Sequence, residues 1–148
     1  MSKPNPNVFR LLSHALAALF NSRAAFHRQW EQESTLPCAD PVCGRWAGEW
    51  ISDQSGHRGE LRCVMKPNGS NRYQAHFYAT FSKWFRVSYT TELVSQEHDG
   101  AVRLKGEENL GRLAGGTYRS EGEVRGDQFI CQYSCKYDHG TFRLHRSR

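Results

Sequence analysis

From Gly44 almost to the C-terminus, the chain consists of short stretches in which apolar and polar residues alternate. Alternation with a period of two is the pattern of a β-strand with one face in a core and the other in water. Eight such stretches follow one another, separated by turn sequences such as Asn68-Gly69 and Asp99-Gly100. Tight turns with no helical period between them predict an antiparallel meander, and such a sheet removes its open edges by closing into an up-and-down barrel.

The alternation also predicts which side chains face the interior of this all-β, eight-stranded barrel. In the first stretch, Trp46 and Trp50 share one face. In the third stretch, His76 has the opposite parity to its apolar neighbours, so we expect it to point outward. The apolar faces of the third and seventh stretches comprise Tyr73, Ala75, Phe77, Ala79, Phe129, Cys131, Tyr133, Cys135 and Tyr137.

A segment with helical spacing precedes the barrel. Its apolar residues run from Val8 to Trp30 and include Leu12, Leu16, Leu19 and Phe20, which predicts an N-terminal amphipathic helix. We therefore divide the chain into a disordered lead over 1–7, the helix over 8–30, a linker over 31–43 and the barrel domain over 44–148. The longest apolar run covers 15–20, which is too short to span a bilayer. The helix then either packs on the barrel or makes weak contact with a membrane surface.

The net charge of +5 is unevenly distributed along the chain. Residues 1–30 contain four basic residues and no acidic one, and the last seven residues contain three arginines. A near-neutral body with basic ends is not typical of a nucleic-acid-binding face, so we predict no nucleic-acid partner. The basic ends fit either an anionic lipid surface or simple solubility. Free cysteines favour a reducing compartment, whereas a bridge between Cys38 and Cys43 would favour an oxidising one, so the sequence does not fix the compartment. We lean toward a cytoplasmic protein, with a membrane-peripheral position as the alternative.

Five cysteines cannot all pair within one chain. Cys131 and Cys135 are four residues apart in one predicted strand, about 13 Å at ~3.3 Å per residue, whereas a disulfide needs Cα atoms within about 7 Å. We expect these two and Cys63 to behave as core residues. Cys38 and Cys43, in a proline-containing loop, either close a small disulfide or stay free.

Neither a metal site nor a cofactor is predicted, because no second Cys or His pair has zinc-ligand spacing. His57 and His139 lie in turns that a meander brings to the same barrel end, near Asp53 and Asp138. Such a group can serve as an acid–base or metal site, or the histidines can be ordinary polar turn residues. We favour the turn interpretation and predict no catalytic residue.

Gly44-Arg45-Trp46 in the first strand, eight meander strands and Arg146 near the end resemble the calycin superfamily of lipocalins, fatty-acid-binding proteins and avidins. In that group a first-strand tryptophan packs beneath an arginine from the end of the barrel. The resemblance assigns these roles to Trp46 and to Arg143 or Arg146. It spans roughly 44–146 and implies a cup that binds a small, mostly apolar molecule.

Many large aromatic side chains are predicted to face the interior, and this suits a small-molecule site. We therefore predict a lipocalin-like barrel that binds one small apolar or aromatic ligand. The expected ligand-binding residues are Trp50, Phe77, Ala79, Tyr89, Tyr118, Phe129 and Tyr133. Two alternatives remain: a barrel enzyme of the cyclase or isomerase type, and a solid structural or membrane-peripheral accessory protein. The last is a real competitor, because eight strands are near the limit at which side chains fill a barrel.

Overall fold

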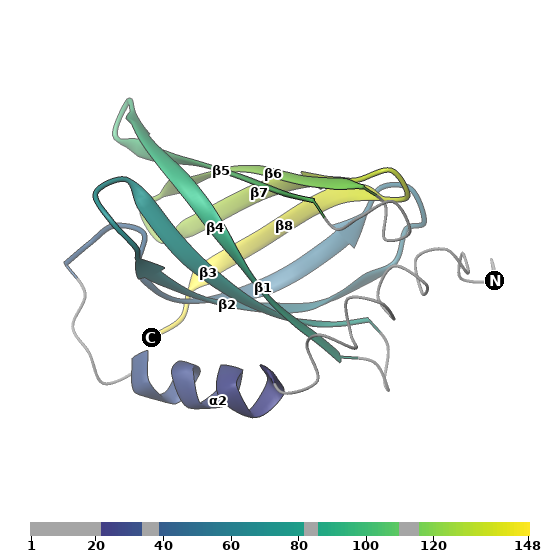
Figure 1. The fold of residues 1–148 in the computed structure, drawn as a ribbon, viewed down its shortest axis with the longest axis horizontal. Coiled ribbons are helices and arrows are strands. Elements are labelled where there is room, and N and C mark those ends of the chain that lie inside the picture. Colours follow the sequence, from purple (N-terminus) through teal and green to yellow (C-terminus); the bar gives the residue numbers. More distant parts are fainter. Residues whose placement is uncertain (1–21, 34–38, 82–85, 110–115) are drawn as a thin grey trace.

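The structure, a computed structural model, describes residues 22–33, 39–81, 86–109 and 116–148. Eight strands form a closed antiparallel barrel in chain order, and the last strand pairs with the first (Figure 1). The elements are α2 (Ser22–Glu33), β1 (Gly44–Ser52), β2 (Arg58–Pro67), β3 (Arg72–Thr80), β4 (Arg86–His98), β5 (Ala101–Asn109), β6 (Thr117–Arg125), β7 (Gln128–Ser134) and β8 (His139–Arg146). The predicted fold, an eight-stranded up-and-down barrel preceded by a helix, is confirmed.

The Trp46 side chain closes one end of the barrel. It is fully buried, and its indole Nε1 donates to the Val42 carbonyl oxygen at 2.9 Å. The Arg146 guanidinium lies 4.4 Å from the centre of the Trp46 ring and also donates to the carbonyl oxygens of Cys43 and Pro41. Of the two arginines that the calycin resemblance offered, Arg146 covers the tryptophan, whereas Arg143 is exposed on the outer face.

The seam between β1 and β8 requires a glycine where the two backbones come close. A Cβ atom at Gly48 would lie 1.9 Å from the carbonyl oxygen of Arg143. Gly48 is paired with Leu144 in the β1–β8 ladder, so a side chain there would push apart the strands that close the barrel.

α2 packs against the outer surface of the barrel over β1–β4 (Figure 1). Phe26 is fully buried and stacks on Tyr78 of β3, with ring centres 5.1 Å apart. Trp30 lies between the guanidinium groups of Arg45 and Arg62. No helix in the described ranges has the length and apolar character needed to cross a bilayer.

Part of the N-terminal prediction lies outside the described residues: the lead over 1–7, residues 8–21 of the helix with Leu12, Leu16, Leu19 and Phe20, and residues 34–38 of the linker. The described helix continues to Glu33, three residues past the predicted end at 30.

His76 faces away from the barrel interior, as its parity predicts, yet it is buried because α2 covers it. Its Nδ1 lies 2.6 Å from the Gln29 Oε1 and its Nε2 lies 2.7 Å from the Ser88 Oγ. Burial lowers the pKa of His76, so the neutral ring joins the helix to two strands.

Two of the cysteines are buried in the interior, as expected. Cys63 and Cys131 are free and buried, and Cys135 is free and half-buried. Burial raises the pKa of both buried thiols, to about 12 for Cys131, which makes them poor nucleophiles. Cys43 is disulfide-bonded, and its expected partner Cys38 lies outside the described residues.

Two C-terminal arginines provide a matched test of the barrel closure. Arg146 and Arg148 both pair with Asp127, but Arg146 also covers Trp46 and binds two backbone carbonyls. We expect Arg146→Ala to lower the free energy of unfolding by about 2–4 kcal/mol. Arg148→Ala should change it by less than about 0.5 kcal/mol. Denaturant unfolding measures both, and equal losses would show that the contact with Trp46 contributes nothing.

Candidate ligand-binding site

All seven predicted ligand-binding residues face the barrel interior, but they do not form one group. Phe77, Tyr89, Tyr118 and Tyr133 come together in the half of the barrel that is remote from Trp46. Phe129 instead packs edge-on against Trp46, with ring centres 6.0 Å apart, and so belongs to the closed end. One continuous hydrophobic core nevertheless connects all seven residues, including Trp50 and Ala79.

Five aromatic rings form a continuous belt around the interior, which we call the aromatic belt. The distances between successive ring centres are 5.1 Å for Phe77–Tyr89, 6.4 Å for Tyr89–Tyr118, 6.0 Å for Tyr118–Tyr133, 4.8 Å for Tyr133–Phe142 and 5.7 Å for Phe142–Phe77. A flat ligand inserted between two stacked rings needs about 7 Å between their centres, two carbon contacts of about 3.5 Å. A ligand can therefore lie on the belt, but it cannot enter between its rings without displacing them.

Sequence reasoning missed two aromatic residues of this site. Phe142 was not among the expected ligand-binding residues, although it completes the belt. Phe81, just after β3, packs against Trp50 with ring centres 4.7 Å apart. The parity of β3 extended by two residues past Ala79 was the available signal for Phe81.

The tyrosine hydroxyls of the belt are hydrogen-bonded. The hydroxyls of Tyr118 and Tyr89 are hydrogen-bonded to each other. Tyr133 donates to the Asp138 Oδ2 at 3.1 Å, and Ser52 donates to the Oδ1 of the same carboxylate at 2.6 Å. Burial raises the pKa of Tyr133, and the negative charge of Asp138 adds to this. The Asp138 contacts link the end of β1 to the turn between β7 and β8.

The ladder between β4 and β5 covers only part of the two strands. These strands pair over Val94–His98 and Ala101–Lys105. Residues 90–93 and 106–109, which lie opposite one another in the same register, are not paired in the described ranges. Lumen-facing residues near this unpaired part of the seam are half-exposed, whereas those of β5 and β6 toward the closed end are buried. We call this region the lumen mouth; its residues are Tyr89, Gly106, Glu108, Tyr118 and Ser120.

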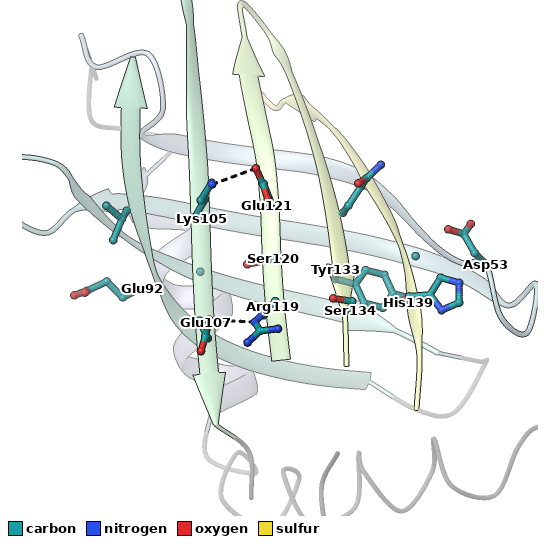
Figure 2. A pocket seen from close by; sticks show the side chains of 14 residues that line it. Asp53, Glu92, Lys105, Glu107, Arg119, Ser120, Glu121, Tyr133, Ser134 and His139 are labelled. Atoms are coloured by element: carbon teal, nitrogen blue, oxygen red, sulfur yellow. Dashed lines mark hydrogen bonds and ion pairs between the residues drawn. The ribbon is translucent and has the colours of Figure 1, made fainter. Parts of the chain in front are cut away.

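A hollow of about 720 Å³ lies on the side of the barrel formed by β4–β8. Figure 2 shows its lining, in which Lys105 pairs with Glu121 and Arg119 with Glu107. Most of these side chains belong to the outer faces of the strands, while Ser120 and Tyr133 belong to the lumen face. Tyr133 is therefore the one predicted ligand-binding residue in this lining. A second hollow, of about 590 Å³, lies at the closed end beside Arg146.

The two turn histidines do not form a metal site. His57 and His139 are both exposed, and no group of three His, Cys, Asp or Glu residues in the described ranges can hold a metal ion. The nearby Asp138 carboxylate binds Ser52 and Tyr133 instead.

No protein-family model matches the chain, and no curated protein matches it. Among solved structures, the chain is similar to a single-residue mutant of the fluorescent protein UnaG, with a TM-score of 0.42 and 5% sequence identity. The match covers 75% of this chain and 99% of the other. The closed eight-stranded meander and the arginine over the first-strand tryptophan are the two features that the calycin resemblance led us to expect.

The tyrosines provide a pH test of the buried site. The pKa is raised for four of the six tyrosines, namely Tyr73 (to about 12), Tyr89, Tyr118 and Tyr133, chiefly by burial. A tyrosine with a raised native pKa binds its proton more tightly in the folded state. Its contribution to stability is therefore complete below the ordinary value of 10.0 and is lost as the pH rises through the native pKa.

We expect the melting temperature to fall steadily above about pH 10. Phenolate absorbance should show these four tyrosines ionising only as the chain unfolds. Full ionisation of all six tyrosines with the melting temperature unchanged would contradict the burial described here.

Proposed function

We propose that the barrel binds one small apolar or aromatic molecule, which enters at the lumen mouth and lies against the aromatic belt. The observation that carries this proposal is the incomplete burial of Tyr89 and Tyr118. Both belong to the lumen face and to the belt, yet both remain partly exposed, unlike the interior residues at the closed end. Aromatic side chains are the typical lining of a small-molecule pocket.

The unpaired seam between β4 and β5 supports the same proposal. A ligand can approach over the lumen-facing residues 106, 118 and 120 without breaking a described strand pairing, because β4 and β5 are joined only from Val94 onward.

A solid structural barrel is the second candidate, and the aromatic belt is the observation that favours it. Every ring of the belt contacts two others, so the lumen is filled at that level. The two candidates differ in whether space for a ligand exists between the belt and the mouth.

Binding of N-phenyl-1-naphthylamine, a neutral dye that fluoresces in apolar surroundings, distinguishes the candidates. We expect it to bind wild-type protein with micromolar affinity and to accept excitation energy from Trp50. Ala79→Phe and Ser120→Phe should each weaken binding at least about tenfold, because one added ring fills the space that the ligand needs. Ala79 is buried, whereas Ser120 is half-exposed and tolerates a larger side chain better.

Gln132→Phe is the matched control. Gln132 is exposed in the lining of the outer hollow, on the strand that carries Tyr133. It should leave dye binding unchanged while thermal melts verify that all three variants fold. Loss of binding in Gln132→Phe alone would place the dye in the outer hollow, and absence of binding to the wild type would favour the solid barrel.

A further inference from the structure

We infer that the ligand carries a hydrogen-bond donor, as a neutral or cationic group and not as a carboxylate, and that Glu108 receives it at the lumen mouth. This inference rests on the proposed function, and it assigns Glu108 as the residue that selects the ligand's charge.

Glu108 belongs to the lumen face of β5. Val102 and Leu104, which have the same parity, are buried in the core, and Glu108 is paired with Tyr118 of the aromatic belt. Its side chain is half-buried. Burial raises the pKa of Tyr89, and the negative charge of Glu108 contributes to that rise, so the carboxylate acts on the belt from close by.

No hydrogen bond or ion pair engages the Glu108 carboxylate in the structure as described. Its neighbour Glu107, on the outer face of the same strand, pairs with Arg119 at 3.1 Å. Water reaches this half-exposed carboxylate, and a ligand at the mouth would displace some of that water. A donor group on a ligand can replace that water as the partner of Glu108.

The distribution of charged side chains in the lumen supports the same inference. Among the described lumen-facing positions of the eight strands, the basic side chain is Arg146, which lies at the closed end and is engaged by Trp46 and two backbone carbonyls. A carboxylate ligand at the mouth would thus meet the negative charge of Glu108 with no described cation beside it. The Tyr118 hydroxyl is hydrogen-bonded to Tyr89 and keeps an acceptor lone pair for a donor on the ligand.

Competition between two ligands of equal chain length and opposite charge tests this assignment. Dodecylammonium and dodecanoate, both below their micelle concentrations at pH 7, are titrated against bound N-phenyl-1-naphthylamine. We expect dodecylammonium to displace the dye at a concentration at least about tenfold lower, the preference that one charge-assisted hydrogen bond provides. Glu108→Gln keeps the size of the side chain and should bring the ratio of the two concentrations near one.

Glu107→Gln is the control variant, because it removes the same charge one residue away on the outer face; the ratio should stay at the wild-type value. If the dye binds but dodecanoate competes equally well or better, or if Glu108→Gln leaves the ratio unchanged, the role of Glu108 is wrong and the proposed pocket stands. If the dye does not bind to the wild type, both proposals are wrong.

Discussion

The contact between Arg146 and Trp46 determines how the two ends of this barrel differ. The arginine covers the first-strand tryptophan and binds carbonyl oxygens of the segment that leads into β1. Because this ties the last strand to the start of the first, the end near Trp46 is sealed by packed side chains. Arg146 is also the basic side chain among the described lumen-facing residues, and its contacts hold it at the closed end. The described part of the interior toward the mouth therefore carries a carboxylate and hydroxyls but no cation.

The outer surface is asymmetric as well. α2 covers β1–β4 through Phe26, Trp30 and the buried His76, whereas the described outer faces of β5–β8 carry mainly polar and charged side chains. The seam where β4 and β5 separate lies at the border of these two halves. β4, which α2 covers, is therefore the neighbour of β5, which the helix does not cover. The lumen mouth lies between these two strands.

The barrel was predictable because one face of each strand is buried. Such a strand alternates apolar and polar residues with a period of two, and the sequence shows this alternation directly. The closing contact followed from Trp46 and Arg146, although the pattern alone did not choose between Arg146 and Arg143. His76 shows the limit of this reasoning: its parity gave its direction, but its burial depends on a helix packing from outside, which alternation within a strand does not report.

The candidate site was predictable as a set of inward-facing residues and not as an arrangement. Phe129 and Tyr133 are four residues apart on one strand, yet they belong to opposite ends of the interior. Which rings are in contact depends on the stagger between neighbouring strands. The aromatic belt, and the place of Phe142 in it, could therefore not be predicted without knowing the pairing register. The role of Glu108 was not predicted, because a charged residue at an inward position breaks the apolar alternation and suggests that the strand has ended. Its place at the lumen mouth becomes clear only once the unpaired part of the β4–β5 seam is known.

Tyrosine ring signals test the central claim, a ligand site at the lumen mouth, most directly. In the full chain with isotope-labelled tyrosine, nuclear magnetic resonance follows each ring as N-phenyl-1-naphthylamine is added. The account predicts that the signals of Tyr89, Tyr118 and Tyr133 shift and saturate together at one dye per chain, while Tyr73 at the closed end and Tyr78 beneath α2 stay in place. Shifts confined to Tyr73 or Tyr78, or a spectrum that the dye leaves unchanged, would contradict it.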